Sequence, residues 1–202
     1  MLLIFGMRSR FKVLGQGTFF CQQCGGDRHY AHKQARRWFT LFFIPLIPLK
    51  VLGEFVECQT CKTTYKPTVL TMPTTSGLQE QLVTAYREAA VWLLRGGANG
   101  RAAALAVLSD VAGRPWTDAE LDTDLQVLDV APMLDRLVTL SGNLTEQGKE
   151  RFLTACTEIA AGGGVLSTDE RQLIDRIAAA LSVSPAHARG VIDQTLDHLN
   201  QS

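Results

Sequence analysis

Four of the five cysteines in this 202-residue chain fall in two Cys-x-x-Cys pairs, Cys21 with Cys24 and Cys58 with Cys61. A Cys-x-x-Cys turn presents two thiolates to one ion, and two such turns supply the four ligands of a tetrahedral Zn²⁺ site, with Zn–S near ~2.3 Å. We therefore predict one structural zinc ion at these four residues. Because four protein ligands leave no open coordination position, we expect no catalysis at this site and no enzyme activity.

Two alternatives use the same thiols differently. One is a dithiol redox protein, although that class usually combines one Cys-x-x-Cys pair with a βαβ pattern, which this sequence lacks. The other is iron in a rubredoxin-like site, because the ligand type does not exclude it. His29 and His32 lie close to the first pair and are expected to stay outside the ligand set. Cys156 falls in a helical pattern and is expected in a hydrophobic core.

Short apolar segments beside the cysteine pairs predict the strands that position them. They are GTFF at 17–20, EFVE at 54–57 and TTYK at 63–66. Strand, knuckle and strand, repeated twice, form a zinc ribbon. Gly25 and Gly26 follow the first pair, where a tight knuckle needs positive φ or close backbone approach, whereas Lys62 and polar residues follow the second.

The segment between the pairs contains the most hydrophobic stretch of the chain, RRWFTLFFIPLIPLK at 36–50. If Cys24 and Cys58 bind one ion, both ends of this segment meet, so it does not cross a bilayer once. Its apolar run, Trp38–Leu49, is also shorter than the ~20 residues of a membrane span and contains two prolines. We expect an out-and-back arm in which IPLIP turns or bulges. Its apolar side chains are expected to pack on the strand LLIFG at 2–6 and on the second domain; the alternatives are a partner-binding surface and a membrane-surface contact.

Charge divides the chain into two parts. Residues 1–70 contain ten Lys or Arg against three Asp or Glu, whereas residues 71–202 contain ten against seventeen. This asymmetry favours two domains. A group of bases with nearby aromatic residues is compatible with nucleic-acid binding, the alternative being a solvated strand face. The group comprises Arg28, Lys33, Arg36 and Arg37, with Tyr30 and Trp38.

Composition also predicts the domain boundaries. The stretch KPTVLTMPTTSG is rich in Pro, Thr and Gly, and it predicts a linker at 71–77 between a zinc ribbon at 1–70 and a helical domain at 78–202. About seven helices with short loops are expected after it, opened by the cap residues Ser76, Thr117, Asn143, Ser167 and Ser184, and by Pro132. The predicted fold class is therefore α+β multidomain, a small β zinc ribbon followed by an all-α bundle.

Three stretches of the first domain carry a family resemblance: VLGQGTFFCQQCGGDRHY, ARRWFTLFFIPLIPL and GEFVECQTCKTTY. They resemble the small bacterial zinc-ribbon domains with a WF-x-LFFIPLIPL signature between two Cys-x-x-Cys pairs. The resemblance covers about residues 1–70. It implies zinc at the four cysteines, no catalytic role, and an apolar segment that is a built-in part of the fold.

The second domain contains an internal echo, in which AGRPWTDAEL at 112–121 aligns with GGGVLSTDER at 162–171. It indicates a duplicated helix–turn–helix pair, with chance similarity as the alternative. The second copy, IAAGGGVLSTDERQLIDRIAAALSVSPAHARGVI, is similar to the TerB-like family, associated with tellurite resistance. Gly163 stands where that family often has an acidic residue, so the resemblance carries over no acidic metal or partner site. Glu120 and Glu170 are predicted as helix caps, with a cation role as the alternative.

Cellular location and function are predicted last. The start of the chain, MLLIFGMRSR, lacks the basic region and the cleavage site of a secretory signal, so we expect a cytoplasmic protein whose thiols stay reduced. The favoured function is a non-enzymatic zinc-binding protein with a helical interaction domain that binds a protein partner in a stress or membrane-associated assembly. Nucleic-acid binding by the basic ribbon is the second hypothesis, and a dithiol redox protein is the third.

Overall fold

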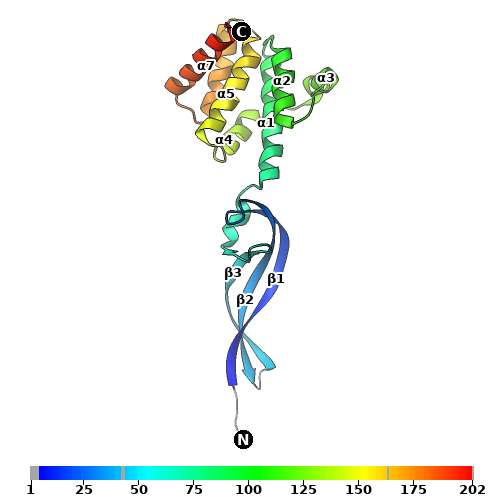
Figure 1. Cartoon of the computed structure of the whole chain (residues 1–202), viewed down its shortest axis with the longest axis vertical. Helices are drawn as coiled ribbons and strands as arrows, with labels where there is room; N and C mark the ends of the chain where they lie inside the picture. The colour runs from blue at the N-terminus through cyan, green and yellow to red at the C-terminus, as the bar shows by residue number, and fades with distance from the viewer. Residues whose placement is uncertain (1–4, 42–43, 163, 202) are drawn as a thin grey trace. The chain divides into compact units, whose positions relative to one another are not determined.

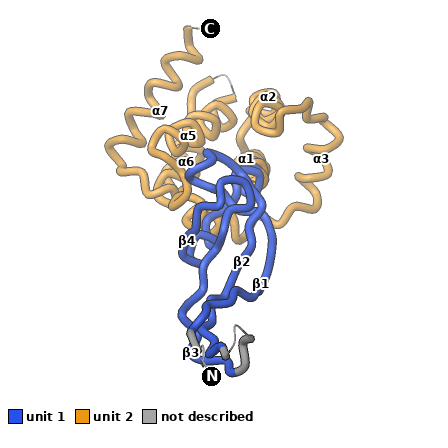
Figure 2. Tube along the Cα trace, turned by 60° about the horizontal axis from the view of Figure 1, so that its bottom comes forward, with its two compact units in different colours: residues 1–79 blue, residues 80–202 orange. Residues whose placement is uncertain are grey.

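The computed structural model describes residues 5–41, 44–162 and 164–201. Over these residues the chain is α+β, with a four-stranded antiparallel sheet followed by seven α-helices (Figure 1). This confirms the predicted fold class. The chain divides into two compact units, Met1–Gln79 and Glu80–Ser202 (Figure 2).

Unit 1 is built on a meander of long strands in the order β1-β2-β3-β4. The first cysteine pair lies between β1 and β2, and the second lies between β3 and β4. The strands expected beside the cysteine pairs are therefore confirmed. The strands are β1 (Phe5–Cys21), β2 (Gly26–Leu41), β3 (Ile44–Cys58) and β4 (Thr64–Tyr65), followed by the 3₁₀ helix η1 (Pro67–Thr71).

The arm between the cysteine pairs goes out along β2 and returns along β3, as expected. The IPLIP stretch, however, does not form the turn, because it already belongs to β3 from its first residue, Ile44. The pairing with β2 shifts register opposite this stretch, so the expected bulges are present. Prolines are tolerated here because this half of β3 is an edge, since β4 pairs only with Val56 and Glu57. Phe42 and Phe43 lie outside the described residues.

Burial in unit 1 is concentrated at the cysteine end of the sheet. Its core contains Phe19, Val56 and Val69 together with the cysteines. On the arm, by contrast, Ile47 is 55% exposed and Leu52 is 48% exposed. The expectation that the arm is buried is therefore wrong for these two side chains, because the described strands of unit 1 leave this part of the sheet open to solvent. The expected packing on LLIFG involves side chains outside the described ones.

The predicted linker is shorter in the structure. Helix α1 (Thr75–Arg95) begins within the stretch 71–77 that the composition assigned to it. The hydroxyl of Thr74 accepts a hydrogen bond from Gly77 N at 3.0 Å, so Thr74 caps the helix in place of Ser76. The Asp27 carboxylate also accepts hydrogen bonds from the first backbone N–H groups of α1, including Thr75 N at 2.8 Å. Because an anionic side chain satisfies N–H groups at a helix start, the helix can begin earlier than its sequence pattern suggests.

The described residues of unit 2 form helices joined by short loops, and α5 packs against several of them. Helix α5 contacts α2, α6 and α7. Its residues Phe152, Leu153, Cys156 and Ile159 are fully buried, which confirms the prediction that Cys156 is a core residue. The helices after α1 are α2 (Arg101–Ala112), α3 (Asp118–Val127), α4 (Met133–Ser141), α5 (Glu146–Ala161), α6 (Thr168–Ala180) and α7 (Pro185–Leu199).

The residues at the helix starts can be compared one by one with the predicted caps. Thr117 and Ser167 each form a complete capping box, with Glu120 and Glu170 respectively, so both predicted caps and both glutamate roles are confirmed. Ser184 caps α7, with proline in the first turn, as predicted. Pro132 directly precedes α4. The prediction that Asn143 caps a helix is wrong. The hydroxyl of Thr145 accepts the hydrogen bond from Gly148 N, and α5 therefore starts two residues later than predicted.

Two ion pairs with buried carboxylates fasten α1 inside unit 2. Arg87 binds Asp124 of α3 through both its Nε, at 3.0 Å, and its Nη2. Arg136 of α4 binds Glu88 through Nε at 3.0 Å and Nη2 at 2.6 Å. Buried charges need such paired, hydrogen-bonded partners. In the described part of the chain, no helix combines the length and hydropathy of a membrane span.

Candidate metal centre

The four cysteines of the two pairs meet in unit 1, as their spacing predicts. Their sulfur atoms all lie within 4.8 Å of one another, and Cys21 Sγ is 3.7 Å from Cys61 Sγ. Cys21 and Cys58 are fully buried, whereas Cys24 and Cys61 are half-buried. All four are free thiols. Residues 40 positions apart in sequence are therefore held at ligand distance by the sheet.

Each cysteine pair forms the same backbone turn. Gly25 N donates to Cys21 O at 2.9 Å, and Lys62 N donates to Cys58 O at 3.0 Å. The residue after each pair has left-handed backbone geometry, with φ of 66° at Gly25 and 61° at Lys62. The two knuckles thus have the same hydrogen bond and the same left-handed φ, although the residue at that position is glycine in one and lysine in the other.

Two hydroxyl groups, those of Tyr65 and Thr63, lie beside sulfur atoms of the cluster. Neither contact is predicted by the sequence. Tyr65 OH lies 3.2 Å from Cys21 Sγ and accepts a hydrogen bond from Gln23 N at 3.3 Å. The Thr63 hydroxyl lies 3.3 Å from Cys61 Sγ. Both residues belong to the polar run after the second pair, but their sequence pattern does not show which side chains point inward. Hydrogen bonds of this kind orient metal ligands and tune their charge.

Aromatic packing holds Tyr65 against the core. Its ring meets the ring of Phe19 edge-on, with the centroids 5.5 Å apart, and the Tyr30 ring also meets Phe19 edge-on at 5.7 Å. Gly17 lies opposite Tyr30 in the sheet, and a Cβ at Gly17 would lie 3.0 Å from the Tyr30 ring. A side chain there would displace the tyrosine ring, so glycine is what permits this packing. The tyrosine whose hydroxyl lies beside Cys21 Sγ is therefore held by packing against Phe19.

The pKa values of the thiols diverge because their surroundings differ. Burial, followed by contacts with the neighbouring sulfurs, raises the pKa of Cys24 to about 12. Hydrogen bonds from the side chain and backbone of Thr63 lower the pKa of Cys61 to about 6. Burial would raise the pKa of Cys21, but hydrogen bonds, chiefly from Tyr65, bring it below its usual value. The cluster does not carry four thiolates at neutral pH by itself, so a cation that binds all four must displace protons.

The arrangement fits a tetrahedral thiolate-bound ion. A Zn–S distance of ~2.3 Å in a regular tetrahedron places sulfur atoms about 3.8 Å apart. The Cys21–Cys61 separation of 3.7 Å matches this value, and the remaining separations do not exceed 4.8 Å. Four soft ligands and no carboxylate or imidazole in the cluster are typical of structural zinc sites or iron–sulfur sites.

Two of the residues near the first pair, His32 and Lys33, lie beside acidic side chains of β3. His32 Nε2 lies 3.0 Å from Glu54 Oε2, and Lys33 Nζ lies 2.7 Å from Glu57 Oε1. The cysteine cluster includes neither His32 nor His29. The basic group expected for nucleic-acid binding is therefore divided. Lys33 is paired with an acidic residue across the sheet, and nucleic-acid binding stays a prediction.

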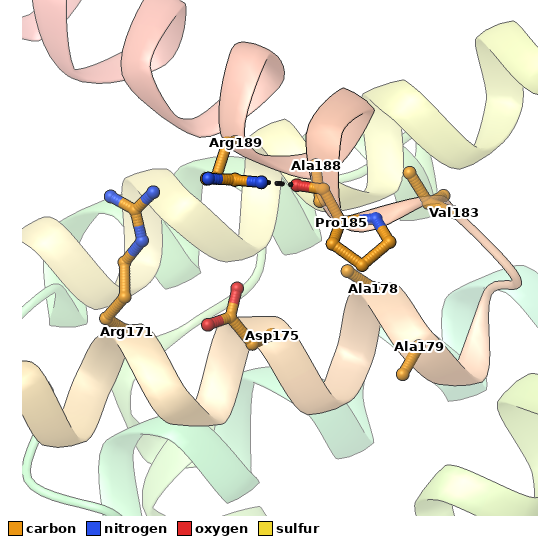
Figure 3. A pocket seen from close by; sticks show the side chains of 8 residues that line it. All are labelled: Arg171, Asp175, Ala178, Ala179, Val183, Pro185, Ala188 and Arg189. Carbon is orange, nitrogen blue, oxygen red and sulfur yellow. Dashed lines mark hydrogen bonds between the residues drawn. The ribbon is translucent and has the colours of Figure 1, made fainter.

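Unit 2 offers a cavity of about 310 Å³ between α6 and α7 (Figure 3). Its polar lining residues are Arg171, Asp175 and Arg189. Arg171 Nη1 binds Asp193 at 3.3 Å, and Arg189 Nε donates to Pro185 O at 3.2 Å (Figure 3). Both guanidinium groups are already engaged within unit 2, so the cavity indicates no particular ligand.

Both glutamates of the internal echo are helix caps, and Glu120 also forms a salt bridge. Glu120 binds the backbone and the hydroxyl of Thr117, and Arg114 Nη2 lies 2.9 Å from its carboxylate. Arg114, and then the Thr117 hydrogen bonds, lower the pKa of Glu120 to about 2. Each copy of the turn starts with a left-handed glycine, Gly113 or Gly162. Gly163, aligned with the family's acidic position, lies outside the described residues.

Comparison with known proteins supports the assignment of the cysteine site. A model of a zinc-ribbon family matches residues 19–77, a segment that includes all four cysteines. No curated protein and no solved structure matches the chain. The family match ends close to the start of α1, so the resemblance of the helical part to the TerB-like family stays a prediction.

Proposed function

We propose that the chain is a non-enzymatic zinc-binding protein in which one Zn²⁺ ion, held by Cys21, Cys24, Cys58 and Cys61, stabilises unit 1. The observation that carries the proposal is the convergence of four sulfur atoms at tetrahedral spacing in a segment that matches a zinc-ribbon family. Zinc is favoured over iron because thiolate knuckles of this spacing are typical of closed structural zinc sites.

The surroundings of the sulfur atoms support a structural role. Cys21 and Cys58 are fully buried, and hydroxyl groups of Thr63 and Tyr65 contact the cluster. When bound, the ion would displace the remaining thiol protons and stabilise four thiolates. It would join the end of β1 to the end of β3, which fixes the base of the arm. Four protein ligands leave no position for a substrate, and so no catalytic role is proposed.

Metal analysis of the purified full chain tests this proposal. We expect one zinc per chain, and four thiols that resist a thiol reagent until a chelator removes the metal. Cys156→Ala is the matched control because Cys156 is fully buried in unit 2 and does not belong to the cluster. It should keep one zinc, whereas Cys58→Ser should lose it. Iron with visible charge-transfer absorption, or disulfide turnover in place of metal binding, would contradict the proposal.

For the helical part, we propose an interaction domain of the TerB-like kind that binds a protein partner in the cytoplasm, in a stress or tellurite-resistance-type assembly. The support is the pair of capping-box turns at Thr117 and Ser167, each preceded by a left-handed glycine. Affinity purification from the native host, with residues 80–202 compared with the full chain, tests it. If partners are captured by the full chain alone, or by neither, the helical part is not the partner-binding element.

A further inference from the structure

The arm of unit 1 has a layer of bases directly behind an uncharged end. Strand register places Arg8 opposite Trp38, Arg10 opposite Arg36, and Ser9 opposite Arg37. On β3, Lys50 falls in the register shift between Val51 and Pro48, beside the same rungs. We call the five bases Arg8, Arg10, Arg36, Arg37 and Lys50 the basic collar. It spans three rungs of the ladder, or about 7 Å of strand.

Beyond the collar the arm continues for three more residues of β1 to the end of the described strands. One rung there joins Met7, Phe39 and Ile47 across all three strands. The segments beyond the collar, 5–7, 39–41 and 44–47, contain no charged residue. Three residues of strand correspond to about 10 Å. Over the described strands, the part of the arm beyond the collar is therefore an uncharged tip of about 10 Å ahead of a cationic layer.

Several side chains in this part of unit 1 are exposed. Met7 is 65% exposed and Ile47 is 55% exposed, and Phe11, just behind the collar, is 61% exposed. All five bases of the collar are exposed as well. Large apolar side chains gathered on one exposed surface indicate a contact site, whereas scattered ones do not.

The charge of the arm selects the kind of contact. Residues 5–14, 34–41 and 44–53 contain six Lys or Arg and no Asp or Glu. A second copy of the same surface would bring two cationic collars together, which disfavours self-association. The phosphates of a nucleic acid would pair with the bases, but they would offer no apolar contact to the uncharged tip. An anionic lipid surface satisfies both, because its phosphates lie at headgroup level and its acyl chains lie beneath.

We propose that the tip of the arm docks on an anionic phospholipid bilayer, with Met7, Phe39 and Ile47 entering the interface and the basic collar meeting lipid phosphates. The length of the tip agrees with the depth to which interfacial elements insert into a bilayer, because that depth is about 5–10 Å and the tip is about 10 Å long. Trp38 lies opposite Arg8, at the level of the collar. Tryptophan is favoured at the headgroup level of a membrane, which is where the collar would lie. The open edges of β1 and β3 prevent deeper entry, because unpaired strand edges are not tolerated in hydrocarbon.

Co-flotation of the zinc-loaded full chain with vesicles tests this proposal. The vesicles are phosphatidylcholine alone and an equimolar mixture with phosphatidylglycerol. We expect binding to the mixture, weak or no binding to phosphatidylcholine, and release at high salt. Each base near an anionic surface contributes about fivefold, so Arg10→Gln/Arg36→Gln/Arg37→Gln should weaken binding about a hundredfold. Met7→Ser/Ile47→Ser should weaken it by at least about tenfold.

Matched variants on unit 2 control for charge and hydrophobicity. Arg151→Gln/Arg176→Gln/Arg189→Gln removes three exposed bases, and Val127→Ser/Val138→Ser removes two exposed apolar side chains. Both should bind vesicles like the wild type. Zinc content and circular dichroism of every variant confirm that the ribbon and the helices remain folded.

Three outcomes would overturn the proposal. The first is equal binding of the arm variants and the wild type to the anionic vesicles. The second is a dimer in lipid-free light scattering that Met7→Ser/Ile47→Ser dissolves, which would assign the tip to self-association. The third is single-stranded DNA binding that needs the collar but not Met7 or Ile47, together with no vesicle binding, which would assign the arm to nucleic acid. None of these outcomes changes the zinc content, so the test is separate from that of the metal site.

Discussion

The residue after each cysteine pair offers a sharp test of the metal centre. Gly25 and Lys62 share left-handed φ, but only glycine adopts it without cost. An L-residue pays about 1–2 kcal/mol for this conformation, and glycine loses about 0.5–1 kcal/mol more backbone entropy on folding. Replacing Lys62 by glycine should therefore stabilise the second knuckle by about 0.5–1 kcal/mol.

The change is measured through metal affinity. Structural zinc sites form together with their metal, so knuckle stability contributes to the apparent dissociation constant. Lys62→Gly also removes a positive charge, so the matched reference is Lys62→Ala, which removes the same charge and keeps the strained φ. Lys62→Gly should bind zinc about two- to fivefold more tightly than Lys62→Ala, in competition with a chromophoric chelator.

The first knuckle gives the reciprocal test. A Cβ at Gly25 meets no atom within 4 Å, so Gly25→Ala costs only backbone strain and should weaken zinc binding about fivefold. Gly26 has no positive φ, and its added Cβ would lie an ordinary 3.6 Å from Arg28 Nη1, so Gly26→Ala should change affinity less than about twofold. Equal effects at the two glycines, or weaker binding by Lys62→Gly than by Lys62→Ala, would refute the reasoning.

Three further predictions concern single contacts. Tyr65→Phe removes the hydroxyl beside the buried sulfur and should weaken zinc affinity by about tenfold, measured by the same competition, whereas unchanged affinity would deny the hydroxyl a role. Arg87→Met leaves Asp124 buried without its partner, and should lower the free energy of unfolding by about 3 kcal/mol in urea titrations; a loss below about 1 kcal/mol would show that the pair is dispensable. Arg114 holds the pKa of Glu120 at about 2, below its ordinary value of 4.5, so Glu120 contributes stability that is complete above pH 4.5 and is lost as the pH falls toward 2. Glu120→Gln should therefore make the acid-side decline in helical stability shallower, and an unchanged slope would contradict this assignment.

Sequence patterns predicted the parts of the fold that depend on local chemistry. The paired cysteines, the strands beside them and the capping boxes at Thr117 and Ser167 are all present as expected. Each of these signals lies within a few residues and has one main physical solution. Errors appeared where two residues that can cap a helix lie close together in sequence, as with Asn143 and Thr145, because either side chain can accept a hydrogen bond from the first N–H groups.

Other features depended on contacts that no local pattern contains. Helix α1 starts earlier than predicted because the carboxylate of Asp27, which is distant in sequence, accepts hydrogen bonds from its first N–H groups. Helical conformation at Thr75 is thus set by a tertiary partner. Likewise, the left-handed geometry of Lys62 follows from the knuckle that the cysteines close, not from any preference of lysine.

By itself, the sequence determined that four thiols are available at ligand spacing, that the chain between them must return to its starting point, and that a helical part follows. Only the tertiary structure decided that the sulfur atoms lie within 4.8 Å of one another, that Tyr65 and Thr63 contact them, and that Ile47 and Leu52 of the arm are exposed. The physical reason is that spacing limits which residues can meet, whereas strand register determines which of them do. Register also placed the bases of β1, β2 and β3 in one layer behind an uncharged tip, from stretches far apart in the sequence.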